Sequence, residues 1–180
     1  IDRIKNELKE TFSDMFQWFE SPGHLLEYEP SNGGWSVKQI LEHIALTNHY
    51  LLILIRKGTA KAIEKGSDIN YSQQLQNYDL NWEKLNAIGE HGSFKWNRPE
   101  HMQPCGLESL EEIKRKLNEQ LLECLDLLNR LPNGEGILYK ITMTVNNLGK
   151  IDVYHYIYFL AQHARRHLQQ MEKIKYEFNS

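Results

Sequence analysis

The chain has 180 residues and a formal net charge of −3, with 21 Lys and Arg against 24 Asp and Glu. This length suits one domain over residues 1–180 with a core of ordinary size. The charge balance lacks the basic footprint of a nucleic-acid-binding protein, and no apolar run approaches the roughly 20 residues that span a bilayer. Two cysteines are too few for a disulfide framework, and no secretory signal is visible. We therefore expect a cytoplasmic protein with free thiols.

The first half of the chain predicts two long helices. Apolar residues recur at three- and four-residue steps over residues 1–19, which indicates an amphipathic helix. A loop rich in Pro, Asn and Gly follows, and then Ser36 with Gln39 three residues later forms a capping-box pattern. A second helix is expected from this cap to about Arg56, with Gly58 as its stop.

Residues 58–106 form a long connection in which Gly, Pro, Asn and Ser are scattered. Residues 79–88 could hold a helical segment, and so long a connection usually carries structure or function of its own. Trp82 and Trp96 lie within it. Aromatic residues in loops often mark interfaces, so a homodimer is one expectation, and simple capping of the bundle is the equal alternative.

Two further helices complete the predicted architecture. Ser109 with Glu112 is a second capping-box candidate, and leucines at helical spacing follow it to Pro132. Asp152 can cap a fourth helix that continues to about Tyr176. The irregular segment between these helices includes an Ile-Thr-Met-Thr-Val stretch that could pass for a short strand. Four long helices without a convincing set of strands predict an all-α four-helix bundle.

Three histidines form a candidate metal site. His163 and His167 are four residues apart in an apolar run, so both project from one helix face with Cβ atoms about 5–6 Å apart. His43 lies on a different helix. Three imidazoles suit Zn, Ni, Cu or Fe and leave positions open for water or a substrate thiol. The plainer alternative is that the pair are polar members of a half-buried helix.

The neighbours of these histidines favour a pocket between helices. On a helical projection, Tyr156, Leu160 and Gln170 share the face of His163 and His167, while Leu46, Thr47 and Tyr50 share the face of His43. An apolar lining with a few polar groups is typical of such pockets. The remaining histidines are weaker candidates. His49 and His155 point away from these faces, and His91 or His101 could reach the pocket only if the connection folds over it.

The two cysteines are also weak candidates. Cys124 fits the core, and Cys105 is a loop thiol without an evident adjacent base.

Two segments carry a resemblance to a known family. Trp35–His43, which reads Trp-Ser-Val-Lys-Gln-Ile-Leu-Glu-His, resembles the second-helix signature of the DinB/YfiT-like superfamily. Leu148–Asp152 followed by His163–Gln170 resembles its fourth-helix signature. The resemblance implies an up-down-down-up bundle with a divalent metal, commonly Zn or Ni, on three histidines. Those positions fall on His43, His163 and His167 here. One departure is Asn146-Asn147, where many relatives have His-Pro.

The resemblance also implies a metal-dependent S-transferase or isomerase that uses a low-molecular-weight thiol such as bacillithiol, mycothiol or glutathione. Our leading hypothesis is therefore an enzyme in which the metal activates a thiol for attack on an electrophilic small molecule. Tyr50 could hydrogen-bond the substrate, and Gln170 could orient a ligand. A metal-dependent hydrolase is the alternative, but no carboxylate falls on either histidine face to serve as a base. A bundle that binds metal or a small ligand without turnover is the competing class.

Overall fold

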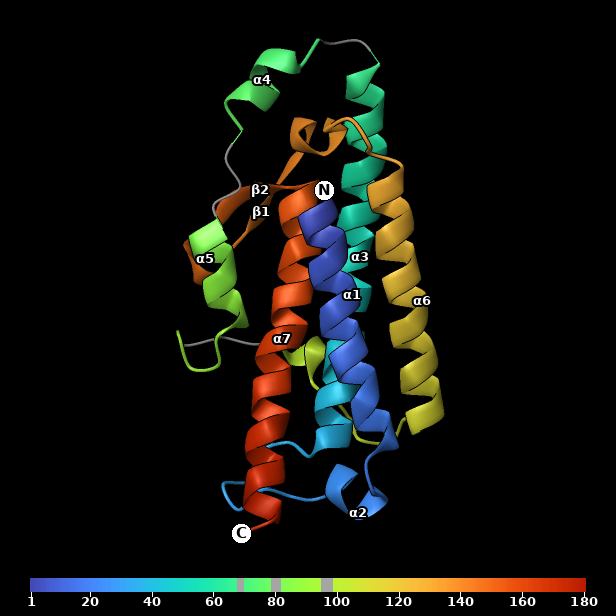
Figure 1. Ribbon diagram of the computed structural model, residues 1–180, viewed down its shortest axis with the longest axis vertical. Coiled ribbons are helices and arrows are strands. Elements are labelled where there is room, and N and C mark those ends of the chain that lie inside the picture. The colour runs from blue at the N-terminus through green and yellow to red at the C-terminus, as the bar shows by residue number, and fades with distance from the viewer. Residues whose placement is uncertain (68–69, 79–81, 95–98) are drawn as a thin grey trace.

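The computed structural model describes residues 1–180 apart from 68–69, 79–81 and 95–98. Four long helices lie side by side: α1 (Asp2–Gln17), α3 (Val37–Gly66), α6 (Leu110–Asn129) and α7 (Val153–Phe178). Figure 1 shows α1 and α7 running in one direction, and α3 and α6 in the opposite direction. The protein is thus an all-α four-helix bundle, as the helical periodicity predicts, with the up-down-down-up order that the family resemblance implies. No helix in the described part of the chain has the length and apolar composition needed to cross a membrane.

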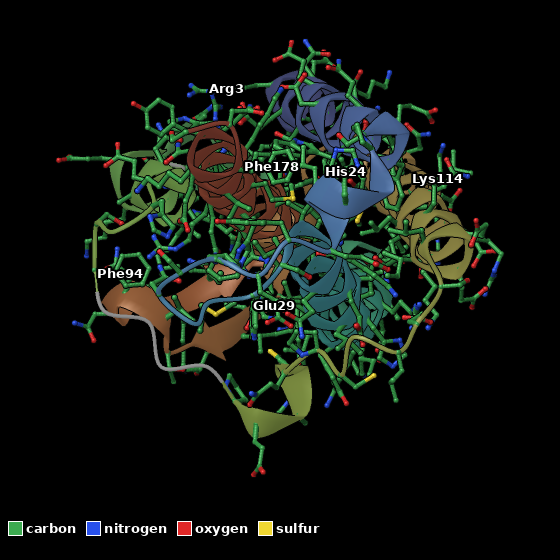
Figure 2. All side chains as sticks on the ribbon, turned by 90° about the horizontal axis from the view of Figure 1, so that it is seen from below. Arg3, His24, Glu29, Phe94, Lys114 and Phe178 are labelled. Carbon is green, nitrogen blue, oxygen red and sulfur yellow. The ribbon has the colours of Figure 1, made fainter. Side chains whose placement is uncertain are left out.

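Short elements form the joints between the long helices. Before α3 and after it they are η1 (Trp18–Glu20), α2 (Gly23–Leu26), α4 (Ser72–Gln76), α5 (Trp82–Asn86), η2 (Ala87–Gly89) and η3 (Glu100–Met102). Between α6 and α7 they are η4 (Glu135–Leu138), β1 (Lys140–Met143), η5 (Val145–Asn147) and β2 (Gly149–Asp152). The view along the bundle in Figure 2 shows His24 of α2 beside Phe178, with ring centroids 5.3 Å apart, so α2 covers the C-terminal end of α7.

Helix α7 is the central element of the core. Every residue from Val153 to Ala164 is buried, because the helix packs against α1 and α3 as well as the β-hairpin and α5. A buried hydroxyl needs a hydrogen-bond partner, and three tyrosines of α7 find theirs in three different segments of the chain. The OH groups of Tyr154, Tyr156 and Tyr158 donate to Leu131 O at 2.7 Å, Thr142 O at 3.0 Å and Asn86 Oδ1 at 2.7 Å.

Helix α3 continues past Gly58, so the predicted stop at this glycine is wrong. A Cβ placed on Gly58 would lie 3.0 Å from Val153 Cγ2 and 3.6 Å from Ile141 Cδ1. The glycine therefore allows the β-hairpin and the start of α7 to approach the helix closely. The residues that follow it include Ala60 and Ala62, which favour helix, and the helix ends at Gly66.

A two-stranded antiparallel sheet leads into α7. Strand β1 overlaps the stretch that the sequence marked as a possible strand, but its partner β2 was not predicted. The two pair in the register Lys140↔Asp152 and Ile141↔Ile151. Asn146 and Asn147 reverse the chain between them, with φ of 48° and 52°, a left-handed conformation that asparagine tolerates better than most residues. The departure from His-Pro thus lies in a turn.

Part of the connection between α3 and α6, namely α5 and η2, packs against α7. Its α5 falls within residues 79–88, where the sequence suggested a helical segment. Trp82 is half-buried, with its ring 4.8 Å from Tyr158 and the Arg3 guanidinium 3.8 Å from its ring centroid. This tryptophan therefore packs within the chain, which supports the capping alternative. Trp96 lies outside the described residues, and the homodimer stays a prediction.

Candidate metal centre

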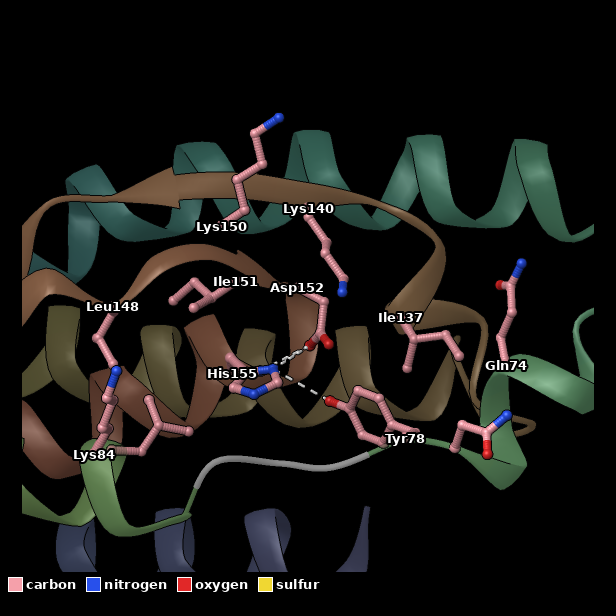
Figure 3. Close-up of a pocket in the computed structure, with 12 residues that line it drawn as sticks. Gln74, Tyr78, Lys84, Ile137, Lys140, Leu148, Lys150, Ile151, Asp152 and His155 are labelled. Carbon is pink, nitrogen blue, oxygen red and sulfur yellow. Dashed lines mark hydrogen bonds and ion pairs between the residues drawn. The ribbon is translucent and has the colours of Figure 1, made fainter.

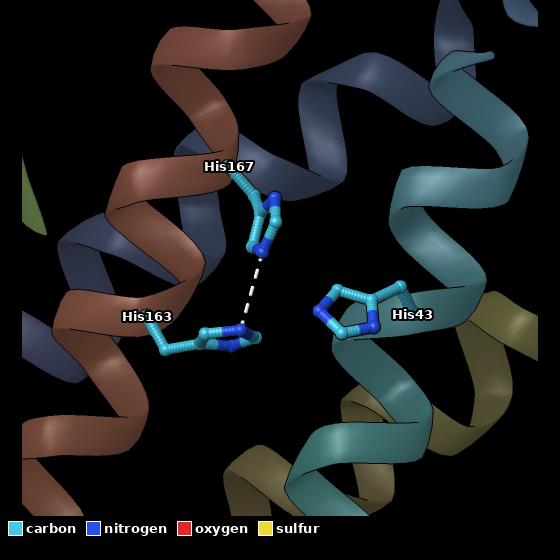
Figure 4. Close-up of side chains that lie close together, drawn as sticks. All are labelled: His43, His163 and His167. Atoms are coloured by element: carbon cyan, nitrogen blue, oxygen red, sulfur yellow. Dashed lines mark hydrogen bonds between the residues drawn. The ribbon is translucent and has the colours of Figure 1, made fainter. Parts of the chain in front are cut away.

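Two long helices bring the three histidines together. His43 lies on α3 two turns after its capping box, in which Gln39 N donates to Ser36 Oγ and Ser36 N donates to Gln39 Oε1. His163 and His167 lie on the facing side of α7 (Figure 4). The three side chains are buried, with 4%, 2% and 8% of each residue exposed.

The ligand atoms of the three residues all lie within 4.8 Å of one another. The His163 and His167 Nε2 atoms are 3.1 Å apart, and the ring of His43 is 5.2 Å and 4.8 Å from theirs. A zinc ion with nitrogen ligands at about 2.0–2.1 Å in tetrahedral geometry brings those nitrogens to comparable separations. The residues could hold a divalent metal after small side-chain adjustments.

Hydrogen bonds to the second ring nitrogen orient two of the imidazoles. His43 Nδ1 is 2.7 Å from Met102 O, and His167 Nδ1 is 3.0 Å from Gln170 Oε1. Both partners are oxygen acceptors, so each Nδ1 carries the hydrogen and each Nε2 presents its lone pair. Such outer contacts fix the tautomer and the ring direction of metal-binding histidines. The imidazole nitrogens of the site therefore fit a metal that prefers neutral nitrogen ligands.

Burial keeps His163 and His167 uncharged. It is the largest cause that lowers the pKa of His167 to about 3, and the charge of a protonated His43 lowers it further. Burial also holds the pKa of His163 well below its usual value, with His167 and His43 adding to the effect. Protonation would place like charges side by side in a poorly solvated space. At neutral pH both residues are in the form that binds a metal.

The long connection folds over the site and supplies contacts that the sequence did not reveal. Met102 accepts from His43, and three residues later Cys105 N and Gly106 N donate to the Glu42 carboxylate at 3.0 and 2.8 Å. Glu42 is buried, so this pair of hydrogen bonds ties the connection to α3 beside His43. A lone carboxylate inside the apolar run of α3 was the available signal that a partner was needed.

Of the two supporting candidates, Gln170 contacts a histidine of the site, whereas Tyr50 lies about two turns beyond His43 on α3. Gln170 contacts His167 as described, whereas Tyr50 packs its ring edge-on against His101, with centroids 4.5 Å apart. His101 and His91 do not join the three-histidine group among the described residues. His91 is instead on the surface, where its Nδ1 is 3.0 Å from Lys173 Nζ.

The cysteines differ from each other. Cys124 is fully buried, and burial raises its pKa to about 12, in keeping with a small core residue. The expectation that Cys105 lacks an adjacent base is wrong, because its Sγ lies 3.1 Å from Glu42 Oε1. The two residues are 63 positions apart, so spacing alone could not pair them.

The comparison with protein families agrees with the fold. A family model described as the DinB superfamily matches residues 5–171, a span that contains His43, His163 and His167. Comparison with curated protein sequences and with solved structures finds no match. Because the family model covers nearly the whole chain, this protein belongs to the DinB superfamily.

Proposed function

We propose that the protein is a metal-dependent transferase that uses a low-molecular-weight thiol, such as bacillithiol, against an electrophilic small molecule. The observation that supports this is the convergence of three buried histidines from α3 and α7, two of which, His163 and His167, are kept neutral by burial. Imidazole nitrogens suit Zn or Ni, and three protein ligands leave at least one position for a small molecule. A bound divalent ion would lower the pKa of a coordinated thiol and favour the thiolate.

The chain's own residues then provide orientation and exclusion of water. Gln170 and Met102 direct the Nε2 atoms of His167 and His43 toward a common point. Trp35 lies against His43, with ring centroids 4.8 Å apart, and helps to shield the histidines from solvent. A rigid, buried ligand set needs little reorganisation when it binds an ion.

Substrate contacts are proposed on the α3 side. Thr47 Oγ1 lies 3.5 Å from His43 Nε2, so a hydroxyl is available beside the site. Tyr50 is our candidate for a hydrogen bond to the electrophile. Its ring is held against His101, at the segment that also supplies the Met102 carbonyl.

Metal-dependent hydrolysis is a weaker proposal for this site. It needs a general base close to the attacking water. Glu42 is the carboxylate next to His43 in the sequence, but its oxygens accept hydrogen bonds from Cys105 and Gly106. This carboxylate is therefore engaged in holding the connection rather than directed at a substrate.

Metal analysis combined with a conjugation assay tests the proposal. The purified protein should contain about one divalent ion per chain and should accelerate the reaction of bacillithiol or glutathione with monochlorobimane or a small epoxide. His163→Ala should lose both properties, whereas His49→Ala, an exposed histidine of α3, should keep them. Stoichiometric metal without any rate above background, across the thiols and electrophiles, would instead indicate a binding protein.

A further inference from the structure

A second polar cavity lies away from the three histidines. It has a volume of about 500 Å³ and is bounded by the β-hairpin, the first turn of α7 and the short helices α4 and α5 (Figure 3). Small-molecule sites commonly have volumes of about 300–1,000 Å³. The cavity shares no lining residue with the metal centre. Its His155 precedes His163 by eight residues, about 12 Å along the helix.

His155 is held in one orientation at the base of this cavity. Its Nδ1 lies 2.8 Å from Asp152 Oδ1 and 3.2 Å from the Tyr78 hydroxyl. Figure 3 shows both contacts ending at the same ring nitrogen. The carboxylate fixes a hydrogen on Nδ1, so Nε2 is the ring nitrogen that a ligand can engage. His155 and Asp152 are otherwise buried, with 8% and 1% exposed.

The charge of the lining is positive. Among the residues that the structure describes, three lysines, Lys84, Lys140 and Lys150, line the cavity together with one carboxylate, Asp152. The side chain of Asp152 is fully buried, and its Oδ1 lies 2.8 Å from His155 Nδ1. Figure 3 shows Lys140 extending toward Asp152 and Lys84 approaching from α5, whereas the amine of Lys150 points away from His155. Lys84 and Lys140 therefore line the cavity from two different elements.

The rest of the lining suits an organic molecule rather than a bare ion. Apolar side chains from four elements or their flanking segments contribute walls, namely Leu85, Ile137, Leu148 and Ile151, and two amides are provided by Gln74 and Asn77. The N-terminus of α7 is not itself the anion site, because Asp152 already accepts from His155 N at 3.1 Å. Recognition of an anion would come from the side chains.

We propose that this cavity is a separate binding site for a small organic anion, one with a carboxylate or phosphate group on an apolar body. Lys84 and Lys140 contact the anionic group, Leu85 and Ile151 contact the body, and His155 lies beside the bound molecule. Hydrogen bonds to an ionised group are stronger than neutral ones. The proposal does not depend on the function assigned to the metal centre.

Calorimetry with three probes tests this site. Phenyl phosphate and benzoate should bind at low ionic strength with millimolar or tighter Kd, and inorganic phosphate should bind more weakly because it lacks the apolar body. The double variant Lys84→Gln/Lys140→Gln should weaken the binding of phenyl phosphate at least about tenfold. The matched control is Lys9→Gln/Lys57→Gln, which removes the same charge from exposed positions on α1 and α3 and should change Kd less than about twofold.

Nuclear magnetic resonance locates the contact. The imidazole signal that disappears in His155→Gln should shift when phenyl phosphate is added to the unmodified protein. The calorimetry is repeated with His167→Ala, which should bind the probe equally well. The proposal is overturned if none of the three probes binds, if both double lysine variants weaken probe binding equally, or if the His155 signal does not shift. Loss of probe binding in His167→Ala would also overturn it, because the anion would then be bound to the metal.

Discussion

His167→Ala should abolish metal binding while the bundle stays folded. Two imidazoles are too few to hold a divalent ion against water and chelators, and the side chain lost is not part of the apolar core. That core includes a stripe on α1 formed by Ile4, Leu8, Phe12 and Met15, each at most 1% exposed. Folding therefore does not depend on the ion, in contrast to a zinc finger.

The same variant should change how the metal-free protein responds to acid. His167 has a pKa of 6.5 when unfolded and about 3 in the fold, where burial disfavours its charge. Below pH 6.5 the unfolded chain gains a proton that the folded chain does not, so the free energy of unfolding decreases as pH falls from 6.5 toward 3. At pH 5 the pH lies about 1.5 units below the pKa of His167 in the unfolded chain, and each unit corresponds to about 1.4 kcal/mol. His167 alone then costs the folded protein about 2 kcal/mol relative to neutral pH.

Urea unfolding at pH 7.5 and pH 5.0, in the presence of EDTA and followed by circular dichroism, measures this difference. The free energy of unfolding should fall between these pH values by about 2 kcal/mol more in the unmodified protein than in His167→Ala. His49→Ala removes an exposed histidine and should behave like the unmodified protein. An equal acid sensitivity in all three proteins would refute the buried neutral state, and stoichiometric metal in His167→Ala would refute the ligand assignment.

Three further substitutions test the surroundings of the site and the packing of α3. Glu42→Gln should lower the free energy of unfolding by about 1–3 kcal/mol because two backbone N–H groups lose their charged acceptor. It should also weaken metal binding in a chelator competition. Glu64→Gln, at an exposed position on the same helix, should have neither effect. Gln170→Ala should raise the metal Kd about tenfold or more, and an unchanged Kd would remove its orienting role. Gly58→Leu should cost about 1–3 kcal/mol in urea unfolding by overpacking against the hairpin, while Leu at the neighbouring exposed Lys57 should be nearly neutral.

The sequence predicted those features that depend on residues close to one another in the chain. Helical periodicity and the caps at Ser36, Ser109 and Asp152 located the long helices, and each of these three side chains accepts a backbone hydrogen bond in the structure. The four-residue spacing of His163 and His167 defines a shared face in any α-helix. Gly58 was misread because a glycine is also found inside helices where another element must approach closely, and the hairpin that approaches it was not predicted.

The sequence did not predict the contacts that orient the ligands from outside their own helix. The carbonyl that fixes His43 belongs to Met102, 59 residues later in a connection with no helical pattern to place it. A backbone carbonyl has no residue type to recognise, so only the fold of the connection can reveal it. The carboxylate of Glu42 holds this segment in place. It accepts hydrogen bonds from two backbone amides just beyond Met102, which attaches the segment to the turn of α3 that carries His43. In this protein the shared face of His163 and His167 could be predicted from their local spacing, whereas the orientation of His43 depends on the long-range hydrogen bonds that Glu42 and Met102 make between α3 and the connection.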